Sequence, residues 1–225
     1  MTWVKVAASM AAAGFMAAAH ADNTVLDEGF DNVAGLGASG WVFTNASAPA
    51  GLSWFQGNSG IFPAKAGPAD SYAAANFNST TADAGVVDNW LISPELTLGT
   101  GTKLKFYTRA ADAGFFDQLE VRFSSGSSSA LSSFSTLVGV VGDAAEAAYP
   151  VGSWIAFTLS LPDAASGRFA LRYSVANAMN ASYIGIDSLT VTTVPVPEPT
   201  TLVLFGLGLA AVGIAQRRKS TFTLV

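Results

Sequence analysis

Hydrophobic and polar residues alternate along short segments in the middle of the chain, and this pattern predicts β-strands. The clearest segments are Thr102–Arg109, Gln118–Phe123 and Arg168–Val175, where every second side chain is apolar and charged side chains stand between them. A repeat of two residues with one charged face is typical of antiparallel strands that are buried on one side. Ser124–Ser133, which is rich in Ser and Gly, is predicted to be a loop between strands.

Further strands are predicted where β-forming residues cluster between Gly, Ser, Asp and Asn. They lie at Thr24–Phe30, Trp41–Thr44, Leu52–Gln56, Tyr72–Phe77, Trp154–Leu159 and Tyr183–Val191. The segment contains no long helical pattern and no internal repeat. About nine to eleven strands in one such segment predict an all-β domain, an antiparallel jelly-roll β-sandwich at residues 22–193.

The N-terminal end has the three parts of a secretory signal. Lys5 precedes an Ala-rich apolar block at Val6–Ala19, and the small residues Ala19 and Ala21 flank His20. A positive charge, an apolar block and an A-x-A site direct export and cleavage by signal peptidase. We therefore predict a signal peptide at residues 1–21, cut after Ala21. A buried Ala-rich helix is the alternative, and it is disfavoured because no polar residues mark an outer face.

The C-terminal end, residues 194–225, combines prolines, an apolar run and a basic cluster. The run Leu202–Ala215 has 14 residues, which is short for a membrane span of about 20. The basic residues that follow it obey the positive-inside rule, so we predict a short transmembrane helix with a cytoplasmic C-terminus. The prolines prevent this helix from extending backward. The residues concerned are Pro195, Pro197, Pro199, Arg217, Arg218 and Lys219.

This tripartite order resembles the PEP-CTERM sorting signal of Gram-negative bacteria, with its literal Pro197-Glu198-Pro199. The resemblance implies recognition by an exosortase that cleaves near this motif, in a host that makes exopolysaccharide. The protein would cross the inner membrane, be anchored transiently, and then reach the cell surface or extracellular matrix. A membrane anchor that is never cut is the alternative.

Composition narrows the available chemistry. The chain has no Cys and one His, His20, which the predicted signal cleavage removes. Without His and Cys there are no Ser-His-Asp triads, Cys nucleophiles or zinc sites of the usual kind. A carboxylate pair, as in glycoside hydrolysis, is the remaining catalytic possibility. The spacing of Glu28, Glu95 and Glu120 does not show that two of them face one cleft, so we predict a protein that is not an enzyme.

The net charge of the predicted mature chain indicates which kinds of partner it can bind. Between residues 22 and 199 there are sixteen acidic residues against seven Lys and Arg, a net charge of −9. An acidic domain in which no basic stripe is evident argues against a nucleic-acid partner. It is compatible with cation binding and with solubility outside the cell.

A second resemblance covers most of residues 22–191. Its parts, in order, are Glu28-Gly29-Phe30-Asp31, Gly40-Trp41, the block Asp88–Leu96 and the closing Ile184–Val191. The block Asn89-Trp90-Leu91-Ile92-Ser93-Pro94 is the most specific of these. The order is similar to the choice-of-anchor J domain, which is related to the cleaved-adhesin and MAM-like jelly rolls. This family carries various C-terminal anchors, and a PEP-CTERM signal is one of them.

The same resemblance implies structural calcium held by one acidic residue in the first strand and one in the last. By position these are Glu28 and Asp187. Calcium takes six to eight oxygen ligands. In the alternative interpretation Glu28 is a solvated or capping residue and Asp187 begins a turn. No Asp-x-Asp-x-Asp-Gly loop is present.

Three functions follow as hypotheses. The first is a non-enzymatic protein of the cell surface and exopolysaccharide matrix, whose partners are signal peptidase, exosortase, the membrane before processing, and exopolysaccharide. The second is a jelly-roll module that binds a glycan or other ligand, and the third is a carboxylate-based hydrolase. Trp41, Trp54, Trp90 and Trp154 could stack on sugars, but their apolar neighbours favour a core position.

Overall fold

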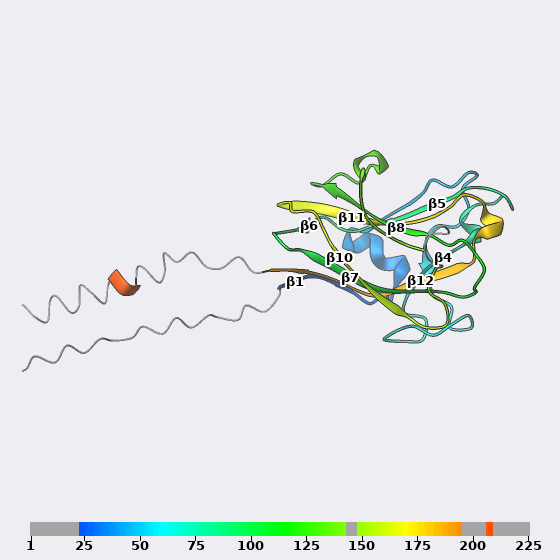
Figure 1. Cartoon of the computed structure of the whole chain (residues 1–225), viewed down its shortest axis with the longest axis horizontal. Helices are drawn as coiled ribbons and strands as arrows, with labels where there is room; N and C mark the ends of the chain where they lie inside the picture. Colours follow the sequence, from blue (N-terminus) through cyan, green and yellow to red (C-terminus); the bar gives the residue numbers. More distant parts are fainter. Residues whose placement is uncertain (1–22, 143–147, 195–205, 209–225) are drawn as a thin grey trace, which may run out of the picture.

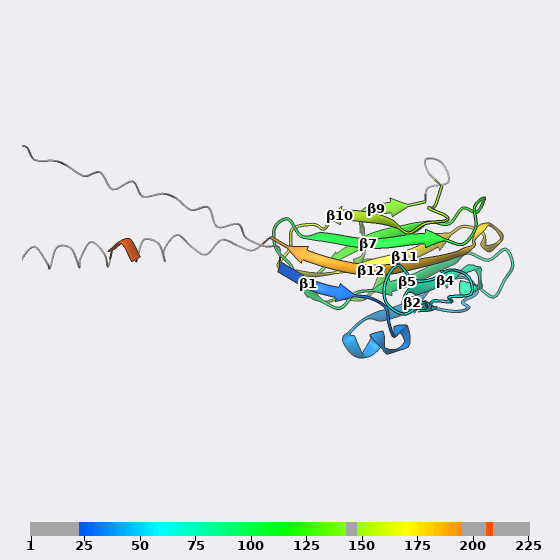
Figure 2. The same cartoon turned by 90° about the horizontal axis from the view of Figure 1, so that it is seen from below.

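The computed structural model describes residues 23–142, 148–194 and 206–208. Within them two antiparallel sheets pack face to face as a β-sandwich (Figures 1 and 2). The strands of the first sheet, called sheet A, are in spatial order β10 (Ile155–Ser160), β7 (Lys103–Ala110), β12 (Tyr183–Thr193), β4 (Ala73–Asn76) and β3 (Phe55–Gln56), and β1 (Asn23–Glu28) also pairs with β12.

The second sheet, called sheet B, has the same number of strands. In spatial order they are β2 (Val42–Asn45), β5 (Val87–Ile92), β11 (Ser166–Val175), β8 (Leu119–Ser125) and β9 (Thr136–Val141), and β6 (Leu96–Thr97) also pairs with β11. The helical elements of the described domain are short 3-10 turns: η1 (Val33–Ser39), η2 (Phe77–Ser79), η3 (Leu131–Ser133) and η4 (Ala178–Asn180). The predicted all-β sandwich is therefore confirmed.

The core lies between the sheets and follows the predicted alternation. On β7, Leu104, Phe106 and Thr108 are fully buried, while Lys103 and Lys105 on the other face are exposed. The same holds on β8 and β11, whose inward side chains Leu119, Val121, Phe169, Leu171 and Tyr173 are fully buried. The buried side chains of the main core fall between residues 30 and 191, so the sandwich has a core that is independent of both chain ends.

The nine predicted strands are present, with shifted ends. Alternation does not predict β5, β6 or β9. Strand β5 lies inside sheet B between β2 and β11, and from Asn89 to Ile92 its side chains are buried on both faces, so it reads as a continuous apolar block. Strand β6 has two residues, and β9, with the sequence TLVGVV, has no polar face.

Two smaller apolar clusters lie on the outer faces of the sheets. The connection between β3 and β4 places Phe62 and Tyr72 on sheet A, where they pack with Tyr183. On sheet B, Phe134 from the connection between β8 and β9 covers Trp90. Each sheet is thus covered in part on its outer side by one of its own loops.

The first strand begins and the last strand ends at the same end of the sandwich, because Asn23 pairs with Thr193 (Figure 1). The predicted signal peptide, with Ala19 and Ala21, lies outside the described residues. So do Pro197, Glu198, Pro199, Arg217, Arg218 and Lys219. Of the predicted membrane helix, only residues 206–208 are described, and they are helical. No helix within the described ranges is long and apolar enough to cross a membrane.

Candidate functional site

A hollow opens at the end of the sandwich opposite the two termini. Strand β7 ends there at Ala110 and β12 begins there at Tyr183, so the loops β4–β5, β7–β8 and β11–β12 meet at this end. The hollow has a volume of about 1040 Å³. We call it the distal hollow, and its lining includes Leu52, Phe77, Asp83, Asp112, Phe115 and Met179.

The distal hollow combines exposed apolar side chains with oxygen acceptors. Phe77 is 48% exposed, Phe115 37% and Met179 68%, which is unusual for large apolar residues gathered in one place. Asp112 accepts a hydrogen bond from the Ser182 hydroxyl at 3.2 Å. Such a surface can hold a ligand that has a flat apolar face and hydroxyl groups. Sequence reasoning missed it because its residues come from separate loops without a shared pattern.

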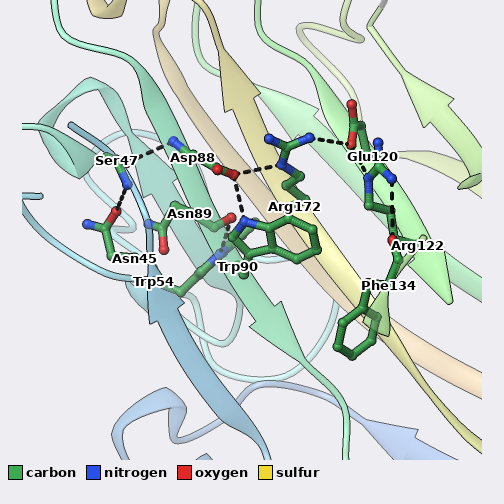
Figure 3. A network of polar contacts seen from close by, with 10 residues as sticks. All are labelled: Asn45, Ser47, Trp54, Asp88, Asn89, Trp90, Glu120, Arg122, Phe134 and Arg172. Atoms are coloured by element: carbon green, nitrogen blue, oxygen red, sulfur yellow. Dashed lines mark hydrogen bonds and ion pairs between the residues drawn. The ribbon is translucent and has the colours of Figure 1, made fainter. Parts of the chain in front are cut away.

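A polar network crosses sheet B on its outer face (Figure 3). Arg172 donates through Nε to Asp88 at 2.6 Å and through Nη1 to Glu120 at 3.0 Å, and its guanidinium lies 5.0 Å from the centre of the Trp90 ring. Arg122 also donates to Glu120. Burial raises the pKa of Glu120, but the hydrogen bonds from Arg122 and Arg172 outweigh it and hold this pKa below its usual range.

The motif block at residues 89–94 is structural. Asn89 is fully buried, and its side-chain amide donates to the Leu52 carbonyl at 3.2 Å and to the Ser79 hydroxyl at 2.9 Å. The Trp90 indole donates to Asp88 at 2.6 Å (Figure 3). The hydroxyl of Ser93 accepts from the Phe169 amide at 3.0 Å. The contacts of Asn89 and Ser93 tie β5 and the residue after it to η2, to β11 and to the loop before β3.

The predicted calcium residues lie on adjacent strands of sheet A. Glu28 ends β1 opposite Leu189, and Asp187 lies two residues earlier on β12. Asp187 is fully buried, and its Oδ2 accepts from the amides of Lys65 at 2.6 Å and Ala66 at 3.1 Å. Burial raises the pKa of Asp187 and these donors oppose that rise. Glu28 accepts from the Phe30 amide at 2.8 Å, and burial raises its pKa too.

This arrangement does not by itself form a calcium shell. The Oδ2 of Asp187 is occupied by two protein donors, and its Oδ1 accepts from the Ser188 hydroxyl at 3.1 Å. Over the described ranges, no group of three or more His, Asp or Glu side chains could hold a metal ion. Calcium needs several oxygens, so this pair would require further carbonyls or water. Calcium binding stays a prediction.

The carboxylates considered for hydrolysis are not brought together. Glu28 lies on β1 of sheet A, and Glu120 lies on β8 of sheet B, where it is paired with arginines. Glu95 is exposed and accepts from the Ser166 hydroxyl at 2.8 Å.

The tryptophans are mostly structural. Trp41, Trp54 and Trp90 are 3–5% exposed, as the core interpretation predicted. Trp154 differs, because it is only half-buried and packs on the outer side of sheet A, 5.5 Å from the rings of Phe62 and Tyr72.

Comparisons with known proteins agree with two parts of the sequence interpretation. Residues 195–219 match the PEP-CTERM protein-sorting motif, which implies exosortase-dependent export. The sandwich is similar to solved cleaved adhesin domains of Lys-gingipain from Porphyromonas gingivalis W83. The K1 domain is 24% identical over 77% of this chain and 100% of that chain, with a TM-score of 0.59. The K3 domain is 23% identical over 77% and 99%, with a TM-score of 0.54.

At these identities the similarity establishes the fold alone. No curated protein matches the chain. The described sandwich therefore has the fold of cleaved adhesin domains and is followed by a PEP-CTERM motif.

Proposed function

We propose that the protein is a non-enzymatic component of the cell surface and exopolysaccharide matrix of a Gram-negative bacterium. In this proposal a choice-of-anchor J-like sandwich is exported by a signal peptide and sorted by an exosortase. The observation that carries the proposal is the PEP-CTERM match at residues 195–219. Only Val194 separates it from the last strand, which ends at Thr193, so the sorting signal directly follows the folded domain.

The layout of the sandwich supports this proposal. The chain enters the sorting motif from the end where Asn23 pairs with Thr193, and the distal hollow lies at the other end. While the C-terminal segment is held at the membrane, the distal hollow is carried on the part of the domain farthest along the strands from the anchor. This is the geometry expected of a module that contacts partners outside the cell.

Deletion of the exosortase gene in the producing bacterium tests the proposal. We expect the wild-type protein in the medium or surface fraction, and in the deletion strain a larger, membrane-retained form. The same experiment with Arg217, Arg218 and Lys219 replaced by Gln should weaken retention during sorting, because the stop charge is lost. Identical size and location in both strains would make the C-terminal segment a plain anchor and overturn the sorting part of the proposal.

A second candidate is a glycan-binding module, and the distal hollow favours it. Exposed aromatic rings offer flat contact to sugar rings, and Asp83 and Asp112 offer acceptors to sugar hydroxyls. A glycan array probed with the secreted protein tests this candidate. Binding that is lost in Phe77→Ala/Phe115→Ala, but kept in the control Leu137→Ala/Val140→Ala on β9, would place the ligand in the distal hollow. Binding that neither pair of substitutions changes would exclude the distal hollow as the ligand site.

A further inference from the structure

Four of the seven basic residues between residues 22 and 199 gather on the outer face of sheet A. Lys103, Lys105 and Arg109 are outward positions of β7, and Lys65 joins them from the loop before β4. Alternate residues of a strand are about 6.7 Å apart, so the β7 positions span about 20 Å. We call these four residues the basic row. The net charge of −9 does not reveal the basic row, and the structure corrects the prediction that no basic stripe is present.

Two cations of the basic row lie over a tyrosine ring, and a third lies over a phenylalanine ring. The ammonium group of Lys65 lies 5.0 Å, and that of Lys105 5.4 Å, from the centre of the Tyr107 ring. The Arg109 guanidinium lies 4.2 Å from the centre of the Phe62 ring. The electrons of an aromatic ring attract a cation that lies over its face.

The basic row lacks acidic partners among the described residues. There the ion pairs join only Arg122 and Arg172 to Glu120 and Asp88 on sheet B. The Nε of Arg109 is buried without a hydrogen-bond acceptor, although a desolvated cation is normally paired.

Acidic residues lie near the basic row, Asp163 beside Gly101 among them, and none of those described forms an ion pair with it. Asp187 is opposite Tyr107 on β12, but it is fully buried and occupied by the amides of Lys65 and Ala66. Asp27 is exposed on β1 opposite Thr190, with β12 between it and β7. Adjacent strands are about 4.8 Å apart, so Asp27 is about 10 Å from β7 across the sheet.

Hydroxyl groups flank the row on both sides. Thr158 and Ser160 of β10 stand opposite Lys105 and Lys103, and Thr190 and Thr192 of β12 stand opposite the same two lysines. Figure 2 shows β10, β7, β12 and β1 side by side along this sheet. The surface is therefore a band of cations and short hydroxyl side chains around a tyrosine ring, which suits a polymer bearing hydroxyls and anions.

We propose that the basic row binds a carboxylate-bearing polysaccharide that lies along β7. The lysines would meet its carboxylates, and the Thr and Ser side chains its hydroxyls. This proposal deepens the proposed function, on which it rests, by naming the kind of matrix polymer.

Charge density favours a polysaccharide over a nucleic acid. Duplex DNA carries one negative charge per about 1.7 Å, so a 20 Å row would face about twelve phosphate charges with four cations, on a domain of net charge −9. A polymer with one carboxylate per sugar or two brings far fewer charges to the same length. It therefore suffers less repulsion from the rest of the domain.

Binding of the purified secreted protein to alginate, a polyuronate, tests the proposal, with neutral dextran and duplex DNA as parallel probes. We expect binding to alginate that weakens with salt. The variant Lys103→Gln/Lys105→Gln should bind about fivefold more weakly, taking about 0.5 kcal/mol for each exposed charge pair. Its melting temperature should not change, because both lysines are exposed.

The control variant Ser129→Glu/Ser135→Glu changes the net charge by the same amount in the β8–β9 loop, and both serines are exposed. It should bind alginate like the wild type. If both variants lost the same amount of alginate binding, the effect would come from net charge alone, and the proposal would be overturned. Equal binding to dextran, tighter binding to DNA than to alginate, or no binding to alginate would overturn it too. These outcomes leave exosortase sorting untouched, since sorting is read from size and location in cells.

Discussion

Two roles can explain the buried carboxylate of Asp187: a calcium ligand, or an acceptor of backbone hydrogen bonds. The sequence resemblance implies a calcium ligand at this position, and in the structure the amides of Lys65 and Ala66, in the loop that covers sheet A, donate to its carboxylate. A buried carboxylate that accepts such hydrogen bonds fixes that loop to the last strand. We expect Asp187→Asn to lower the free energy of unfolding by about 1–3 kcal/mol even in the presence of a chelator, because donors lose a charged acceptor. Chemical denaturation measures this.

The calcium hypothesis predicts a separate effect at the same residue. A hundredfold excess of calcium over Kd would add about 2.7 kcal/mol, or roughly 5–10 °C in melting temperature. Magnesium would substitute poorly because it demands octahedral geometry. Wild type, Asp187→Asn and the exposed control Asp27→Asn are compared by thermal melting. Equal wild-type melting with calcium and with chelator would remove the metal and leave the amide donors as the role of Asp187.

The buried side chain of Asp117 makes the stability of the domain depend on pH. Its carboxylate is 2% exposed, and Oδ2 has no hydrogen-bond partner, while Oδ1 accepts from the Ser182 amide at 2.8 Å and from the Tyr173 hydroxyl. Burial raises its pKa, and these two donors oppose the rise only in part. A raised folded-state pKa stabilises the fold below the ordinary value of an aspartate, and this stability is lost as pH rises through the raised value.

We therefore expect the contribution of Asp117 to the free energy of unfolding to fall as the pH rises above the ordinary pKa of an aspartate. Asp117→Asn should remove this part of the dependence, because no charge is then buried. The control Asp83→Asn, at an exposed position, should keep the wild-type dependence. The measurement is denaturant unfolding across the pH range. Parallel curves for wild type and Asp117→Asn would contradict the assignment.

At the scale of elements, Gly185 determines how closely the β3–β4 loop packs on sheet A. A Cβ at this position would lie 2.8 Å from the Tyr72 ring and 2.9 Å from the Trp154 ring. We expect Gly185→Ala to cost about 1–3 kcal/mol through overpacking and to change the fluorescence of Trp154. Gly99→Ala, whose Cβ would meet nothing within 4 Å, is the control. Equal stability of both variants would contradict this, because it would mean that the β3–β4 loop can shift to accept the added Cβ at no cost in free energy.

Strands with one solvent-exposed face were predictable from the sequence, and strands without such a face were not. Lys103 and Lys105 alternate with buried side chains and reveal β7 directly. Strand β5 carries the most specific motif, yet it lacks an alternating pattern because Trp90 and Ile92 on its outer side are covered by Phe134 and its neighbours. Its role becomes clear only from contacts with other elements, since Asn89 binds Ser79 and Trp90 lies under the Arg172 guanidinium of β11.

At the scale of the whole molecule, the sequence of the C-terminal end was more informative about function than that of the sandwich. The order of Pro-Glu-Pro, apolar run and basic cluster is local in sequence, and it was recognisable without a fold. The distal hollow and the basic row are assembled by strand pairing. Phe77 and Phe115 come from different loops, and Lys65 reaches Tyr107 across the sheet surface. Such sites depend on topology, so composition and spacing did not predict them.

The measurement that tests the central claim most directly is the intact mass of the protein released by the producing cells. The account predicts a chain that begins at Asp22 and ends near Pro197-Glu198-Pro199, without Arg217, Arg218 and Lys219. In an exosortase deletion strain the protein should keep these basic residues and remain with the membrane. A released chain that retains Arg217–Lys219, or a mature form that still contains Lys5, would contradict the account.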